Sequence, residues 1–162
     1  MATDQVIADA WQARREHHHS EAHRDLTAHL LKLRPQAEPL ELARTLCALG
    51  QIDRDLYNFP DSLRHYAEAV HILRSESAPL LLAHALRHLG DVQLEAAEAN
   101  IREALDLYRQ HPEANELDLA NTLRSLALIK HDPALWQEAR ALYEKLNIHP
   151  GVAECDRHLR NS

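Results

Sequence analysis

The chain has 162 residues and a net charge of −7, from 25 acidic and 18 basic residues, which argues against a nucleic-acid-binding protein. Apolar residues make up 45% of the sequence, aromatic residues only 4%, and there are three glycines, a composition that favours one helical domain with a buried core. No apolar run approaches the roughly 20 residues of a membrane span, and no signal peptide is recognisable. A cytoplasmic protein with no membrane or nucleic-acid partner is therefore expected.

Prolines divide the chain into helical segments. All seven fall at segment boundaries, because proline is tolerated in the first turn of a helix but not in its interior. Between them, apolar residues recur at intervals of three and four, and no stretch alternates with period two. The pattern predicts an all-α fold. The expected helices are residues 4–16, 20–34, 39–56, 60–75, 79–92, 93–110, 116–130, 133–147 and 150–160.

Three segments, beginning at Ala43, Ala83 and Ala120, align with one another as an internal repeat. If each begins at position 1, position 7 is Leu and position 8 is Gly or Ala in all three. The residue at position 20 is small and that at position 24 is large, when the second segment is aligned with a gap of five residues after position 8. The residues at positions 8, 20 and 24 are Gly50, Ser62 and Tyr66 in the first, Gly90, Ala97 and Ile101 in the second, and Ala127, Ala139 and Tyr143 in the third. Small residues at positions 8 and 20 let two helices approach closely, and repeated helix pairs predict an α-solenoid.

This pattern resembles the tetratricopeptide repeat (TPR), a helix–turn–helix unit of about 34 residues. The intervals of 40 and 37 residues between successive segments resemble the longer kinesin-light-chain type of repeat, as do His111-Pro112 and His149-Pro150. The aromatic residue that is usual at position 11 is absent, and Asp53 stands there in the first segment. The resemblance implies five units, namely a TPR-like helix pair over 1–37, repeats over 38–78, 79–114 and 115–149, and a C-terminal capping helix over 150–162.

The middle repeat is five residues shorter than the others where its chain should reverse. Gly50 and Ser62 are 12 residues apart, whereas Gly90 and Ala97 are only 7 apart. Residues 91–109 contain no Gly or Pro and consist almost entirely of strong helix formers. One continuous helix near 79–109 is therefore predicted. The alternative left open is that Gly90 ends the first helix in the left-handed conformation and the next residue caps the second.

A fused helix has a consequence for the oligomeric state. It would expose the apolar faces of both arms, at about 25 cal/mol for each Å², and a second chain could cover them by domain swapping. A homodimer is expected on this interpretation, with arms of about 1–90 and 97–162. The predicted hinge residues are Gly90, Asp91, Val92, Gln93, Leu94, Glu95 and Ala96.

The resemblance further implies a concave face lined by positions 2 and 5 of each first helix. Arg87, Arg124 and Arg157 share position 5, and arginine binds carboxylates through two parallel hydrogen bonds. The alternative is a solvated, salt-bridged face. The Lys/Asn carboxylate clamp of chaperone-binding TPR proteins is similar, but this chain does not reproduce its residues. The residues predicted to contact a protein or peptide partner are Arg44, His84, Arg87, Asn121, Arg124 and Arg157.

Other polar residues carry weaker signals. Four histidines fall within residues 17–23, and His84 and His88 are spaced i, i+4, as two ligands of a metal can be. No cysteine or carboxylate completes a zinc signature, so an exposed histidine-rich turn and no metal are expected. Cys47 and Cys155 are expected to be buried free thiols. No phosphate loop, nucleophile elbow or HExxH motif is present, which favours a protein without cofactor or catalytic activity.

The sequence is compatible with two functions. The first is a non-catalytic helical-repeat scaffold for protein–protein interaction that self-associates by domain swapping. The alternative is a monomeric TPR module that binds an acidic peptide or a C-terminus on the arginine strip. An enzyme, such as a hydrolase with a histidine-bound metal, has only the histidine pairs in its favour.

Overall fold

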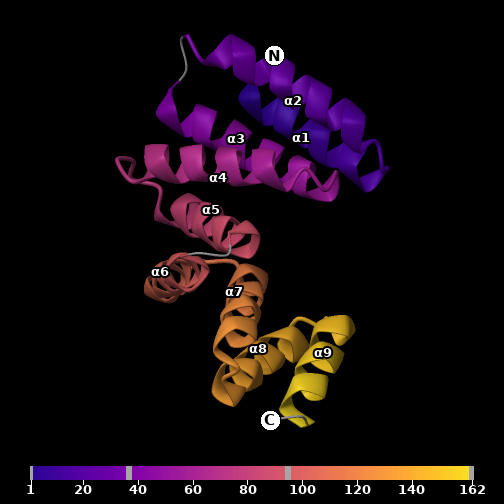
Figure 1. Cartoon of the computed structure of the whole chain (residues 1–162), viewed down its shortest axis with the longest axis vertical. Helices are drawn as coiled ribbons and strands as arrows, with labels where there is room; N and C mark the ends of the chain where they lie inside the picture. The colour runs from indigo at the N-terminus through magenta and orange to yellow at the C-terminus, as the bar shows by residue number, and fades with distance from the viewer. Residues whose placement is uncertain (1, 36–37, 94–95, 161–162) are drawn as a thin grey trace.

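The computed structural model describes residues 2–35, 38–93 and 96–160, and within them the chain forms nine α-helices and no strand (Figure 1). The prediction of an all-α fold is confirmed. No helix in these ranges is long and apolar enough to span a membrane. The helices are α1 (Thr3–Arg15), α2 (His19–Leu33), α3 (Pro39–Asp55), α4 (Phe59–Leu73), α5 (Pro79–Val92), α6 (Ala97–Gln110), α7 (Glu116–Lys130), α8 (Pro133–Lys145) and α9 (His149–Arg160).

The helices stack in chain order, from α1 and α2 at the top of Figure 1 to α9 at the bottom, with the two termini at opposite ends. α1 packs on α2, α3 on α4, α5 on α6 and α7 on α8, while α9 packs on α8. Each pair contacts the next through its second helix, and the first helices also touch in α1–α3 and α5–α7. This arrangement is an α-solenoid, in which each unit contacts mainly its neighbours.

The alignment of small and large residues is visible in the packing of the pairs. A Cβ atom on Gly50 would lie 2.8 Å from the ring of Tyr66, and one on Gly90 would lie 2.4 Å from Cγ1 of Ile101. The Ser62 hydroxyl donates a hydrogen bond of 2.7 Å to the carbonyl of Gly50. Positions 8, 20 and 24 therefore meet where the two helices of a pair approach most closely.

The prediction of one continuous helix near 79–109 is wrong. α5 ends at Val92, and Gln93 is extended (φ −102°, ψ 130°). Ala96 is left-handed (φ 46°), and α6 begins directly after it and packs back on α5 of the same chain. Gly90, Asp91 and Val92, which were predicted to be hinge residues, belong to α5, while Leu94 and Glu95 lie outside the described residues.

The shorter repeat still forms an antiparallel helix pair, because α5 ends earlier and α6 begins later than the corresponding helices α3 and α4. α3 runs five residues past Gly50, and α4 starts three residues before Ser62, whereas α5 runs two residues past Gly90 and α6 starts at Ala97. The alternative with a left-handed Gly90 is not observed either, since no described glycine has a positive φ. Burying Ile101 on α5 is worth about 1.5–3 kcal/mol. That exceeds the few tenths of a kcal/mol per residue that helix formers lose in a turn.

The apolar core follows the stack in two clusters that meet at α6. Ala104 and Tyr108 join the cluster formed by α1–α5, and Ile101 and Leu105 join the cluster formed by α7–α9. α6 is thus the helix that couples the two halves of the molecule. Cys47 and Cys155 are buried and free, as predicted.

Candidate functional site

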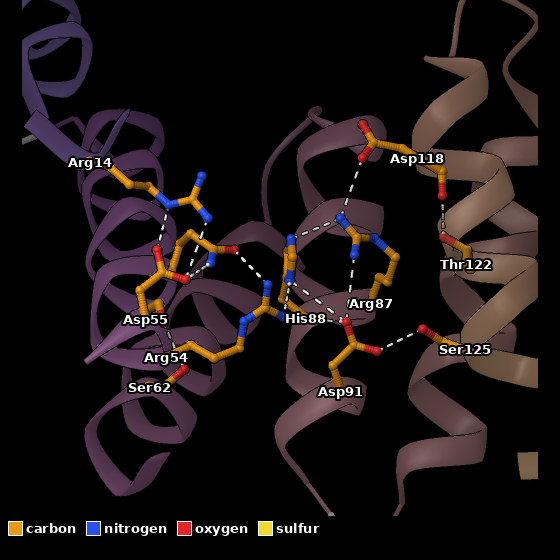
Figure 2. A network of polar contacts seen from close by, with 12 residues as sticks. Arg14, Arg54, Asp55, Ser62, Arg87, His88, Asp91, Asp118, Thr122 and Ser125 are labelled. Carbon is orange, nitrogen blue, oxygen red and sulfur yellow. Dashed lines mark hydrogen bonds and ion pairs between the residues drawn. The ribbon is translucent and has the colours of Figure 1, made fainter. Parts of the chain in front are cut away.

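A network of polar side chains crosses the first helices of four successive pairs, α1, α3, α5 and α7 (Figure 2). On the α1–α3 side, Arg14 forms an ion pair with Asp55, and Asp55 accepts a hydrogen bond of 2.9 Å from Gln51. Gln51 in turn accepts a hydrogen bond of 2.9 Å from Arg54. The guanidinium of Arg54 is thereby held at the C-terminal end of α3 and directed toward α5.

On the α5–α7 side, the network is built around Arg87, which is only 7% exposed. Its Nη atoms lie 3.3 Å from Asp118 of α7 and 3.5 Å from Asp91, one turn further along α5. Asp91 also lies 3.5 Å from Arg54 and accepts a hydrogen bond of 2.7 Å from Ser125. The Nε atom of Arg87 is buried and has no hydrogen-bond partner among the described residues.

His88 connects the α1–α3 part of the network to the α5–α7 part. Its Nδ1 lies 3.1 Å from Arg54 and its Nε2 lies 2.8 Å from Arg87, so both ring nitrogens face guanidinium donors. Burial, together with the charge of Arg87, holds the pKa of His88 well below its ordinary value, and the ring is neutral. A neutral imidazole accepts at only one nitrogen. The ring therefore accepts a hydrogen bond from one of the two guanidinium groups, and its other nitrogen carries the hydrogen.

The second histidine of the predicted i, i+4 pair is a packing partner of the first. The rings of His84 and His88 meet edge to face with centroids 4.5 Å apart, and Tyr66 stacks on His88 at 5.2 Å. Burial, assisted by the charge of Arg87, lowers the pKa of His84 to about 4. The two neutral rings pack against each other, and His88 also packs against Tyr66.

A cavity of about 400 Å³ opens beside this network, between α5, α7 and α9. Three guanidinium groups and two carboxylates line it, together with Asn121 and apolar side chains at its edge. The charged residues in its lining are Arg54, Arg87, Arg124, Asp91 and Glu154. Its volume lies within the range of small-molecule and peptide side-chain sites.

The α7–α9 wall of the cavity is held more tightly than the α5 wall. Arg124 binds Glu154 through two hydrogen bonds of 2.6 Å each, which raise the pKa of the arginine and lower that of the glutamate. The Tyr143 hydroxyl donates a hydrogen bond of 2.8 Å to Asn121 Oδ1, and burial raises the pKa of Tyr143 to about 12. This orientation leaves the amide nitrogen of Asn121 available to an acceptor.

Of the six residues predicted to bind a peptide, three line the cavity together: Arg87, Asn121 and Arg124. The others lie apart from it. Arg44 forms an ion pair of 2.6 Å with Asp4 of α1, and His84 packs on His88. Arg157 is exposed on α9 and is not part of the cavity wall.

Arg54, Asp91 and Glu154 were not predicted to contact a partner, and Asp91 was predicted only as a hinge residue. A signal for Arg54 was present, because it follows Cys47 by seven residues and so lies on the same face of α3. Asp91 likewise follows Arg87 by four residues on one helix face. Both positions fall at the C-terminal end of a first helix, beyond the two positions that the resemblance implied.

Of the four histidines expected in an exposed turn, only His17 and His18 lie in the turn, because α2 begins at His19, and His23 joins a buried polar cluster from α2. His17 and His18 are exposed, and His17 has a positive φ. His23 lies 3.1 Å from Asp53, a fully buried carboxylate that also lies 2.7 Å from His65. Among the described residues no group of three or more His, Cys, Asp or Glu side chains is arranged to hold a metal ion. Asp53 therefore takes the place of the usual aromatic residue as a polar link between α2, α3 and α4.

No protein-family model matches this chain, and no curated protein matches it in sequence. Among solved structures, it is similar to the crystal structure of BtubC (BKLC) from P. vanneervenii. The TM-score is 0.57 at 16% sequence identity, and the match covers 97% of this chain and 78% of that chain. At this identity the likeness concerns the fold alone. The chain is accordingly a helical-repeat protein.

Proposed function

We propose that this protein is a non-catalytic scaffold built from tetratricopeptide-type repeats, and that the cavity between α5, α7 and α9 binds a carboxylate of a partner protein. Helical-repeat proteins generally bind partners on an extended concave surface. Here the observation that carries the proposal is the convergence of Arg54, Arg87 and Arg124 on one cavity. A C-terminal carboxylate is the ligand that we propose for this set, because guanidinium groups bind carboxylates through paired hydrogen bonds.

The lengths of the internal ion pairs support an incoming anion. Charge-assisted N–H···O bonds are usually about 2.7–2.9 Å long. The contacts of Arg54 and Arg87 with Asp91 are both 3.5 Å, and the contact of Arg87 with Asp118 is 3.3 Å. Arg54 and Arg87 are thus only loosely paired with carboxylates of the chain, and their shorter contacts are to the neutral Gln51 and His88. Arg124, in contrast, has two bonds of 2.6 Å to Glu154.

The test is fluorescence anisotropy with a labelled peptide that ends in two aspartates and a free C-terminal carboxylate. We expect Arg124→Ala to weaken binding at least tenfold, because it removes a cation from the cavity and leaves the Glu154 carboxylate there without its partner. Raising the salt concentration should weaken binding further, because exposed ion pairs are screened. Arg157→Ala is the matched control, since it removes an exposed arginine from outside the cavity. Equal losses in the two variants, or no binding of the peptide at low salt, would refute the proposal.

Self-association through exchanged arms is the second candidate, and the tight connection between α5 and α6 favours it. Only residues 93–96 join the two helices, and Ala96 is left-handed without being glycine. Short hinges under strain favour domain swapping, in which the same helix contacts form between two chains. We expect light scattering to detect a dimer at micromolar concentration. Insertion of a five-residue turn after Leu94 should convert it to a monomer, whereas a wild type that is monomeric throughout excludes this candidate.

A further inference from the structure

A second groove, of about 580 Å³, lies between the turn that joins α1 to α2 and the turn that joins α3 to α4. We call it the turn groove. It is separate from the α5–α7–α9 cavity except for Arg54, which lines both. Its remaining lining comes from the end of α1, the histidine-rich turn and the end of α3 with the turn that follows it.

One edge of the turn groove is aromatic and exposed. Tyr57 is 81% exposed and Phe59 is 49% exposed, and their rings meet edge to face with centroids 6.3 Å apart. Tyr57 is also left-handed, with φ 61°, as are His17, His131 and Asn147 in the corresponding turns. The backbone conformation is therefore a feature of the repeated turn, whereas the exposed pair of aromatic rings is particular to this one. Tyrosine is enriched at protein interfaces, so this aromatic edge points to a contact outside the chain.

The rest of the turn groove is rich in basic side chains, although the whole chain carries a charge of −7. Three arginines and two histidines line it against a single carboxylate, that of Asp55. Asp55 is already engaged by Arg14 and Gln51. The exposed Arg15 has Gln12, a neutral side chain, as its hydrogen-bond partner. The groove therefore offers positive charge beside an aromatic edge.

We propose that the turn groove docks a segment of a partner protein in which carboxylates flank an apolar side chain. Tyrosine and arginine are the residues that most often dominate protein–protein binding energy, and the charge of the groove complements an acidic segment. Nucleic acid fits less well, because phosphate-backbone binding uses a longer track of cations and the chain as a whole carries a net charge of −7.

The variant Tyr57→Gly should weaken peptide binding without lowering the stability of the fold. Glycine adopts a positive φ without strain, so we expect the variant to melt no lower than wild type and up to about 4 °C higher. The probe is a fluorescein-labelled ten-residue peptide of Asp and Glu around a central Phe, acetylated and amidated at its ends so that it carries no terminal carboxylate. We expect Tyr57→Gly to weaken its binding at least fivefold.

Two matched variants control for strain relief and for charge. His131→Gly relieves a left-handed residue (φ 51°) in the turn between α7 and α8, away from the groove, and should leave peptide affinity unchanged. Arg15→Ala removes an exposed charge and should weaken binding at least threefold without changing the melting temperature. Arg124→Ala, which affects the cavity between α5, α7 and α9, should leave the affinity for this capped peptide unchanged.

The outcomes are distinct from those that test the concave cavity. Loss of capped-peptide binding in Tyr57→Gly and Arg15→Ala, with intact binding of the peptide that has a free C-terminus, supports the turn groove. Unchanged affinity in both variants overturns it, and so does a lack of binding by wild type at low salt. Tighter binding of a single-stranded oligonucleotide than of the acidic peptide would assign the groove to another class of partner and also overturn the proposal.

Discussion

Replacing Gly90 by alanine changes stability through two opposing effects. In the middle of a helix, alanine is favoured over glycine by up to about 1 kcal/mol. A Cβ atom at this position, however, would lie 2.4 Å from Cγ1 of Ile101, 2.9 Å from its Cδ1 and 3.1 Å from the carbonyl oxygen of Ala97. Ile101 is only 1% exposed and is β-branched, so its χ1 angle is restricted. Overpacking of this kind costs about 1–3 kcal/mol.

The steric cost therefore exceeds the gain in helix propensity, and we expect Gly90→Ala to lower the free energy of unfolding by about 1–2 kcal/mol. Urea unfolding followed by circular dichroism measures this change as a lower midpoint with an unchanged slope. Exchange of arms between two chains would not relieve the clash, because the same contact forms between α5 of one chain and α6 of the other. A variant as stable as wild type, or more stable, would refute the reasoning.

A double-mutant cycle isolates the contact between α5 and α6. Ile101→Ala alone should cost about 2–5 kcal/mol, because it leaves a cavity in the core. In the double variant, the alanine at position 90 no longer meets the isoleucine side chain. The combined cost should therefore be at least about 1 kcal/mol smaller than the sum of the two single costs. Simple additivity would show that Gly90 is not constrained by Ile101.

Three further predictions concern the connection and the buried polar groups. Ala96→Asn should stabilise the protein by about 0.5–1 kcal/mol in urea unfolding, because asparagine tolerates the left-handed conformation of this residue better than alanine does; a loss of stability would count against the connection described here. Burial lowers the pKa of His84 and His88 below the unfolded value of about 6.5. The two neutral rings therefore make their full contribution to the free energy of unfolding only above that pH. It is lost as the pH falls toward 4, by about 3 kcal/mol for His84, and a urea midpoint that does not fall between pH 7 and 5 would contradict it. Asp53→Ala should cost about 2–4 kcal/mol by thermal or urea unfolding, since it leaves the buried His65 without its carboxylate partner; a change below 0.5 kcal/mol would show that the cluster is not coupled to folding.

The helices were predictable because the signals that define them are local. Prolines at segment starts, apolar residues at spacings of three and four, and strong helix formers between them act within one or two turns of chain. The observed ends mostly lie within one or two residues of the expected ones. The alignment also placed Gly50 against Tyr66 and Gly90 against Ile101, because a repeated pattern of small and large residues reflects one repeated contact.

The connection between α5 and α6 shows where local signals mislead. Helix propensity favoured one continuous helix through residues 91–109, and no proline interrupts that stretch. In the folded chain, the helix breaks between Val92 and Ala97, because burying Ile101 on α5 stabilises the molecule more than a few additional helical residues would. The balance depends on how closely the two helices can approach, and that distance is a property of the packed pair.

The candidate site was likewise only partly predictable from the sequence. The repeat alignment by itself determined that Arg87 and Arg124 share a face and that the chain forms stacked helix pairs, because both follow from periodicity along one helix. Only the tertiary structure decided which charges they meet. Asp118 and Glu154 reach these arginines from the next pair, about 30 residues further along the chain, and Arg54 reaches the same cavity from the preceding pair. Ion pairs between units depend on how the helix pairs stack, and periodicity within one helix carries no information about that stacking.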